Sequence, residues 1–165
     1  MNEPADSRNA PLDPPSAACL ERTRSAVLNV LVVVGLGIAA SGLLLRWRDR
    51  WAVVQGPEWL RRGLLGALLA VVVVSYATRR RLAGREVLRD PATRYARFHR
   101  GHLLAAVAAA LAIPLGLAYG WFIRPRIDAV APFWIAALAL GLLALPRGVE
   151  LEGFDEPAGR SESAP

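Results

Sequence analysis

Residues 25–45 read SAVLNVLVVVGLGIAASGLLL, a run of 21 residues without an acidic or basic side chain. At about 1.5 Å per residue, an α-helix of this length reaches roughly 31 Å, which is about the thickness of the hydrocarbon core of a bilayer. Arg22 and Arg24 precede the run, and Arg46 follows it. The stretch therefore predicts a membrane-spanning helix that is bounded by charge at both ends.

Three further uncharged runs follow, at 63–78, 101–123 and 129–146. The four runs hold nearly half of the 165 residues, and all 20 basic and 14 acidic residues lie outside them. A soluble domain distributes charge along its exposed faces, so this segregation excludes an ordinary soluble fold. Trp59 and Leu60 lengthen the short second run, because the stems of the arginines that follow can lie in apolar surroundings while their charged ends reach water.

We therefore predict an all-α integral membrane protein with a bundle of four transmembrane helices. Its spans are expected at about 25–45, 59–78, 101–123 and 129–146. Residues 1–24 contain four prolines and no apolar periodicity, and residues 147–165 are mostly polar and acidic, so both segments are expected to be disordered tails. For the acidic tail, an alternative is that it folds back onto a basic loop.

The most basic part of the chain connects the second and third spans, at residues 79–100, where eight arginines face only two acidic residues. Asp90-Pro91 is typical of a helix start, because aspartate caps a helix N-terminus and proline is favoured at the first helical position. The third helix is therefore expected to begin near Pro91 and to extend two to three turns beyond the membrane. We assign a basic interface to Arg79, Arg80, Arg81, Arg85, Arg94, Arg97 and Arg100.

This basic interface is expected to contact anionic lipid headgroups, and an acidic protein partner is the alternative. Nucleic acid is not expected as a partner, because aromatic platforms and glycine-rich backbone clamps are missing from the sequence.

The distribution of arginines also predicts an orientation. Thirteen arginines fall in the two tails and the middle loop, and seven fall in the other two loops. Because positive charge near helix ends resists translocation, the side with thirteen arginines is expected to be cytoplasmic. We expect a bacterial cytoplasmic membrane with both termini inside. The outer loops at 46–59 and 124–134 share an Arg-x-Arg, Ala-Val and Pro-x-Trp pattern. A duplicated two-helix hairpin would produce this pattern, and so would the residue preferences of a membrane interface without any duplication.

Small residues at four-residue spacing indicate where helices can approach closely in lipid. The third span carries four of them, and each of the other spans carries a pair. The four are Ala108, Ala112, Gly116 and Gly120, and the pairs are Gly37 with Ser41, Gly66 with Ala70, and Ala137 with Gly141. Pro114 is expected to kink the third helix or to free the carbonyl group of Ala110. The sequence leaves open whether the face on the third span packs within the chain or against a partner.

The spans lack the residues that most membrane chemistry requires. No Asp, Glu, Lys or Arg lies in the interior of a span, which counts against an ion-coupled transporter. His99 and His102 are the only histidines, and a metal would need further ligands, so a haem or metal site at these residues is a minor alternative and no cofactor is expected. No nucleophile–base set and no phosphate-binding loop occurs, so enzymatic activity is not expected.

The leading hypothesis is a non-catalytic accessory, assembly or regulatory component that acts through helix–helix packing. Its partners would be other membrane proteins or further copies of the chain. The first alternative is a homo-oligomeric transporter or channel for a small solute, with a pore lined by Ser41, Ser75, Tyr76 and Tyr119. The second is a haem-binding subunit in which His102 from two copies ligates the iron.

Overall fold

The computed structural model describes residues 14–48, 56–82 and 91–151. Within these ranges the chain forms five α-helices and one short 3-10 helix, and no strand occurs there. The helices are α1 (Pro14–Arg48), α2 (Glu58–Leu82), α3 (Pro91–Ala110), α4 (Ala112–Phe122), α5 (Ile127–Leu143) and η2 (Gly148–Glu150). The basic loop residue Arg85 and most of the first outer loop lie outside the described residues.

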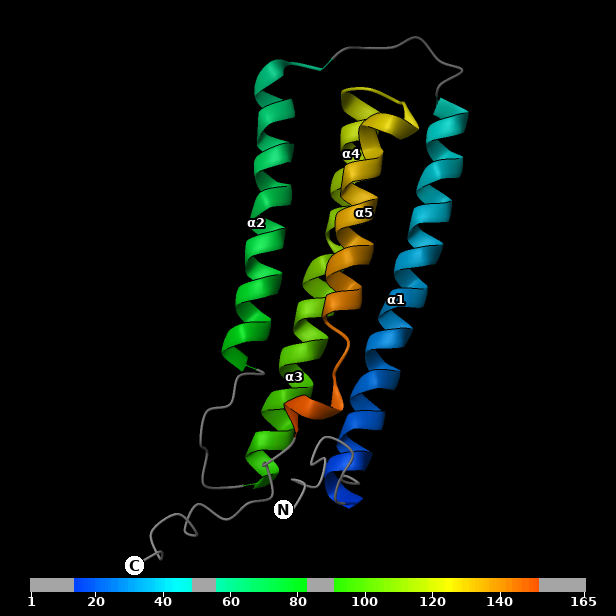
Figure 1. Cartoon of the computed structure of the whole chain (residues 1–165). Helices are drawn as coiled ribbons and strands as arrows, with labels where there is room; N and C mark the ends of the chain where they lie inside the picture. Colours follow the sequence, from blue (N-terminus) through cyan, green and yellow to red (C-terminus); the bar gives the residue numbers. More distant parts are fainter. Residues whose placement is uncertain (1–13, 49–55, 83–90, 152–165) are drawn as a thin grey trace, which may run out of the picture.

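The helices run side by side with alternating direction, as Figure 1 shows. The chain ascends through α1, descends through α2, ascends through α3 and α4 and descends through α5. The described chain therefore begins and ends at one end of the bundle. We call this the polar end; it comprises the first turns of α1 and α3, the last turn of α2 and residues 144–151.

The outer surface of the bundle is apolar. Three helical stretches are long and apolar enough to cross a membrane, over Pro14–Arg48, Glu58–Arg81 and Thr93–Phe122, and α5 is a shorter apolar helix. An exposed apolar surface of this extent is unfavourable in water, whereas it is the ordinary surface of a protein in lipid. The chain is therefore an integral membrane protein. Its exposed apolar side chains include Val32, Val33, Leu36, Leu43, Leu65, Leu69, Val73, Leu104, Val107, Leu111, Ile135, Leu138 and Leu142.

Helix α1 begins before the predicted span. The prediction of a disordered tail is wrong for residues 14–24, which form the first turns of α1. Two prolines are tolerated there, because the first turn of a helix does not use its N–H groups. The segment is held against α3: the hydroxyl groups of Ser16 and Tyr95 are 2.9 Å apart, and the Thr23 hydroxyl is 3.0 Å from Nδ1 of His99.

The prediction of a disordered tail at 147–165 is also wrong where that segment begins. Residues 148–150 form η2, and Leu151, which follows it, is buried. The acidic side chain of Glu150 contacts Arg79 at the end of α2, so this part of the chain follows the alternative in which the tail folds back onto basic residues. Residues 152–165 lie outside the described residues.

The third helix begins at Pro91, as predicted, and is interrupted at Leu111 between α3 and α4. Pro114 explains the interruption, because it has no N–H group to donate to the carbonyl oxygen of Ala110. The Leu111 N–H instead bonds to the carbonyl oxygen of Ala108, at 3.1 Å, which tightens the chain locally.

The small-residue face of α3 and α4 packs inside the chain. Ala112, Gly116 and Gly120 are buried, and Ala108 is half-buried. A Cβ atom added at Gly116 would lie 2.8 Å from Cβ of Phe133 in α5, which is closer than carbon atoms approach. At Gly120 an added Cβ would lie 2.6 Å from a methyl group of Leu45 in α1. The absence of side chains here therefore allows α4 to contact α5 and α1 closely.

Two of the shorter pairs are also covered within the chain. A Cβ atom at Gly37 would lie 3.2 Å from Ile113, and Ser41 is buried. Ala137 is buried, and a Cβ atom at Gly141 would lie 2.6 Å from Leu31. Close packing on these residues therefore joins α1, α4 and α5 into the centre of the bundle.

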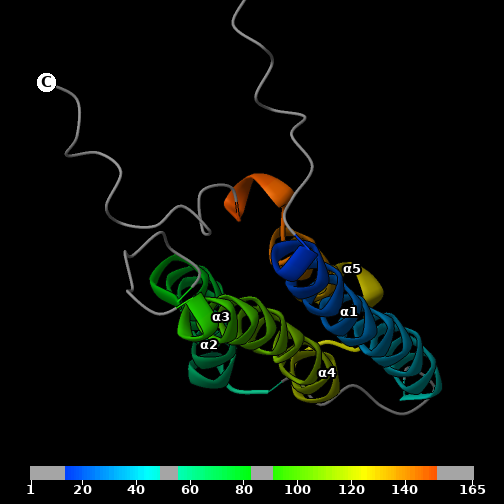
Figure 2. The ribbon, with the colours of Figure 1, turned by 90° about the horizontal axis from the view of Figure 1, so that it is seen from below.

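Helix α2 lies at the outside of the bundle, next to α3 (Figures 1 and 2). Leu68 and Val71 pack against the core, but only 6% of the most apolar stretch of α2 is buried. Ala70 is exposed, and a Cβ atom at Gly66 would meet nothing within 4 Å. The small-residue pair of α2 is thus uncovered, unlike the other three sets.

Candidate functional site

The polar end of the bundle collects basic side chains. Six of the seven arginines assigned to the basic interface lie there, and two arginines of α1 and one that follows α5 join them. At this end of the described chain, nine arginines therefore face only Glu21 and Glu150. The nine are Arg22, Arg24, Arg79, Arg80, Arg81, Arg94, Arg97, Arg100 and Arg147.

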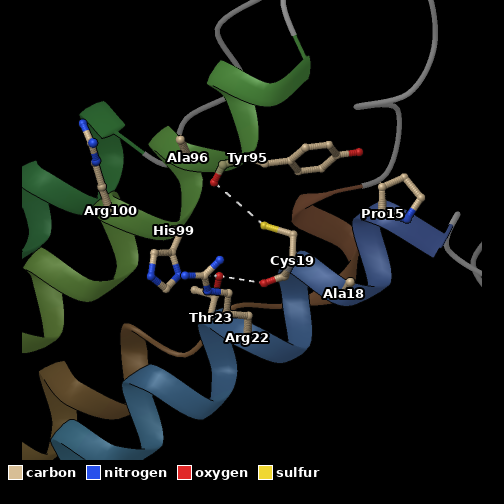
Figure 3. Close-up of a pocket in the computed structure, with 9 residues that line it drawn as sticks. All are labelled: Pro15, Ala18, Cys19, Arg22, Thr23, Tyr95, Ala96, His99 and Arg100. Carbon is tan, nitrogen blue, oxygen red and sulfur yellow. Dashed lines mark hydrogen bonds between the residues drawn. The ribbon is translucent and has the colours of Figure 1, made fainter.

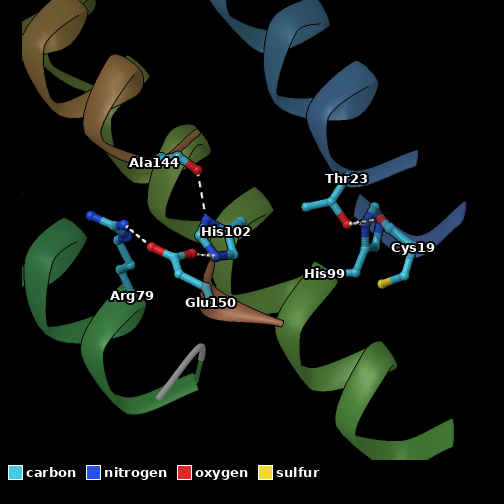
Figure 4. Close-up of polar contacts among 7 residues, drawn as sticks. All are labelled: Cys19, Thr23, Arg79, His99, His102, Ala144 and Glu150. Carbon is cyan, nitrogen blue, oxygen red and sulfur yellow. Dashed lines mark hydrogen bonds and ion pairs between the residues drawn. The ribbon is translucent and has the colours of Figure 1, made fainter. Parts of the chain in front are cut away.

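A buried polar network lies among them, with His102 of α3 at its centre (Figure 4). His102 has no exposed surface. Its Nδ1 atom is 2.7 Å from the carbonyl oxygen of Ala144, which follows α5, and its Nε2 atom is 3.0 Å from Oε2 of Glu150. The Arg79 guanidinium donates a hydrogen bond to the other carboxylate oxygen of Glu150. One network thus joins α2, α3, the end of α5 and η2.

The partner of Nδ1 fixes the role of that ring nitrogen of His102. A carbonyl oxygen only accepts hydrogen bonds, so Nδ1 must carry a hydrogen and donate it to Ala144. Nε2 of His102 and Oε2 of Glu150 are buried and lie 3.0 Å apart, and no other hydrogen-bond partner of either atom occurs among the described residues. This contact ties α3 to η2 at the polar end.

His102 and Arg79 favour the charged form of Glu150. Burial by itself would raise the pKa of Glu150, but the hydrogen bond from His102 and the positive charges of His102 and Arg79 outweigh it and lower this pKa below its ordinary value of 4.5. The contacts of Glu150 with His102 and Arg79 thus hold η2 against α3 and α2.

This arrangement bears on the haem alternative. Both ring nitrogens of His102 already contact protein atoms, so an axial bond to iron would require breaking the contact with Glu150 or that with Ala144. Within the described residues, no three His, Cys, Asp or Glu side chains are grouped so that they could hold a metal ion. The geometry of His102 therefore favours a structural role.

A second feature of the polar end is a cavity of about 430 Å³ between the first turns of α1 and α3 (Figure 3). Thr23 donates a hydrogen bond to the carbonyl oxygen of Cys19, at 2.7 Å. Because its single hydroxyl hydrogen is used there, Thr23 accepts from Nδ1–H of His99, and Nε2 of His99 is outside this network. The side chains with polar or ionisable groups that line the cavity are Cys19, Arg22, Thr23, Tyr95, His99 and Arg100.

The polar residues of the predicted spans are dispersed. Ser75 is buried and donates a hydrogen bond to the carbonyl oxygen of Ala105 at 2.9 Å, which ties α2 to α3. Its neighbour Tyr76 is exposed on the outside of α2, and Tyr119 packs against Phe133 with ring centroids 5.2 Å apart. A single copy of the chain therefore does not present these side chains on one common surface.

Sequence reasoning missed the roles of Glu150, Cys19 and Thr23. All three lie in segments whose composition predicts disordered tails, and each has a partner far away in the sequence: 76 residues separate Thr23 from His99. The acidic tail beside a basic loop was the one available signal for Glu150.

Comparison of the chain with protein families, with curated proteins and with solved structures gives no match. Function is therefore inferred from the residues and contacts of the bundle itself.

Proposed function

We propose that the chain is a non-catalytic component of a bacterial cytoplasmic membrane, which crosses the bilayer four times and binds another membrane protein or a second copy through α2. One observation carries the proposal. Three of the four small-residue sets are covered inside the chain, and the fourth, Gly66 with Ala70, faces outward from the least buried helix. Small residues of this kind permit close backbone approach, on which helix association in lipid depends.

Four crossings agree with the lengths of the helices. Helix α5 has 17 residues, or roughly 26 Å, which is at the lower end of what spans a bilayer. The orientation follows from charge: nine described arginines lie at the polar end, and six lie at the other end. By the positive-inside tendency, the polar end is cytoplasmic. The six are Arg46, Arg48, Arg61, Arg62, Arg124 and Arg126.

The attachment of α2 to the bundle leaves its outer face available. Its contacts with the bundle include Leu68 and Val71 in the apolar core, the buried bond from Ser75 and the ion pair of Arg79. These residues fix the rotation of α2, so that Gly66 and Ala70 point away from the core. A partner helix would therefore meet a preoriented, uncharged surface.

Site-specific photocrosslinking in native membranes tests this proposal. A photoreactive residue replaces Leu69, which is exposed beside Gly66 and Ala70, and a control replaces the equally exposed Val33 of α1. We expect a discrete adduct from position 69 and none from position 33. The mass of the adduct distinguishes a second copy from a different protein.

A second substitution shows whether the small residues matter. Gly66→Leu should abolish the adduct, because its side chain prevents close approach, whereas Gly35→Leu on the open face of α1 should retain it. An adduct that survives Gly66→Leu, or equal adducts from positions 69 and 33, would contradict the proposal.

A further inference from the structure

The cavity between α1 and α3 lies where the uncharged spans end. Thr23 precedes the uncharged run of α1 by two residues, and His99 precedes that of α3 by two residues. Two helical residues correspond to about 3 Å, whereas the headgroup layer extends roughly 5–8 Å beyond the hydrocarbon core. The inner part of the cavity is therefore at the depth of lipid headgroups.

The chemistry of the lining favours an anion. Three of its nine lining residues are Arg22, His99 and Arg100, and none is acidic. Figure 3 shows the Arg22 guanidinium beside the His99 ring, with which it interacts electrostatically, while Arg100 extends away from Cys19. Among the described residues, neither arginine forms a hydrogen bond or an ion pair with the protein. The basic groups of the cavity are therefore not neutralised by acidic side chains.

The rest of the lining is compatible with an organic headgroup. Pro15, Ala18 and Ala96 give the cavity an apolar wall, and its volume of about 430 Å³ falls in the range of small-molecule sites. Basic pockets between helices at the cytoplasmic face of a membrane commonly hold anionic headgroups. Both the depth and the charge of the cavity match such a ligand.

We propose that this cavity binds the phosphate-bearing headgroup of an anionic phospholipid, with Arg22 as its main contact and His99 and Arg100 beside it. Arg22 supplies donors in a planar fork that suits phosphate oxygens. Arg100 is exposed and changes rotamer at little cost, so its guanidinium can join the phosphate. The site goes beyond the proposed contact through α2 and does not depend on it.

Cys19 provides a reporter for this site, because it lines the cavity and is the only cysteine of the chain. The full chain in a nonionic detergent is treated with a maleimide, and the alkylation rate of Cys19 is measured with added phosphatidylglycerol, phosphatidylcholine or inorganic phosphate. We expect phosphatidylglycerol to slow alkylation at least fivefold, and the other two to change the rate less than twofold.

Two arginine variants in α1 distinguish lipid binding in the cavity from general electrostatic attraction to the basic end of the bundle. Arg22→Gln should weaken phosphatidylglycerol binding about fivefold, as expected for one arginine near a membrane surface. Arg24→Gln is the matched control: Arg24 is exposed on the same helix but does not line the cavity, so its loss should change affinity less than twofold. Counting bound lipid by native mass spectrometry gives an independent readout for both variants.

Several results would overturn the proposal. Equal losses in the two variants would indicate only general electrostatic attraction, and equal protection by phosphatidylcholine would remove the preference for anions. Protection by inorganic phosphate alone would assign the cavity to a free anion. A Cys19 thiol that does not react even without lipid would show that the cavity is closed. Each of these readouts is independent of α2, so failure here leaves the proposed crosslinking result unaffected.

Discussion

Replacing Gly116 by alanine tests the packing at the centre of the bundle. The added Cβ would lie 2.8 Å from Cβ of Phe133, whereas carbon atoms pack at about 3.5–4.0 Å, so α4 and α5 must separate by up to about 1 Å. Rotamer changes cannot relieve this contact, because both atoms are attached directly to the backbone. Overpacking of this kind costs about 1–3 kcal/mol.

A matched glycine isolates this cost. Gly35→Ala is also within a helix, but its new Cβ meets nothing within 4 Å. Both variants gain the same helix propensity, about 1 kcal/mol for glycine to alanine in water, so the difference between them is the packing term. We expect Gly116→Ala to be less stable than Gly35→Ala by about 1–3 kcal/mol in reversible unfolding with SDS in mixed micelles, followed by circular dichroism. Equal stabilities would refute the close contact of α4 with α5.

Three further predictions concern the polar contacts. Glu150→Gln should lower the free energy of unfolding by about 1–2 kcal/mol in the same assay, because it removes the charged carboxylate beside His102. The control, Arg80→Gln at an exposed position, should change the free energy of unfolding by less than about 0.5 kcal/mol. The pKa of Glu150 is lower in the folded protein than its ordinary value of 4.5, so the folded state binds fewer protons than the unfolded state as the pH falls. The free energy of unfolding should therefore decrease as the pH drops below about 5. Glu150→Gln should flatten this pH dependence, because it removes the titrating group. An unchanged pH profile in that variant would count against the network. Ser75→Ala should cost about 0.6 kcal/mol, the average for hydrogen bonds between helices in lipid, and no loss would mean that the bond to Ala105 contributes nothing.

The membrane-crossing helices could be predicted because their signal is local. A run of about 20 uncharged residues has few structural alternatives, and Asp90-Pro91 and Pro114 marked the start and the interruption of the third helix. The small-residue spacing on the third helix also identified residues that pack closely, although it did not say which helices they meet. Phe133 and Leu45 supply that contact from distant parts of the chain.

The polar end could not be predicted in the same way. Residues 14–24 begin with two prolines, and they contact Tyr95 and His99, more than 70 residues later in the sequence. Likewise, Glu150 is ordered by His102 and Arg79, and composition alone does not distinguish such a carboxylate from a solvated one. Contacts of this kind form only after the helices have assembled, so no local pattern records them.

The central claim is that the apolar outer surface faces lipid on every helix, including the short α5. The most direct measurement places single spin labels in a Cys19→Ser background in liposomes, at Val33 of α1 and Ile135 of α5, with Arg24 as the control near water. Val33 and Ile135 are each 65% exposed in the bundle. We expect both labels to be accessible to oxygen and shielded from a water-soluble nickel reagent, with the reverse at position 24. A label at position 135 that is as accessible to the nickel reagent as that at position 24 would show that α5 does not cross the membrane.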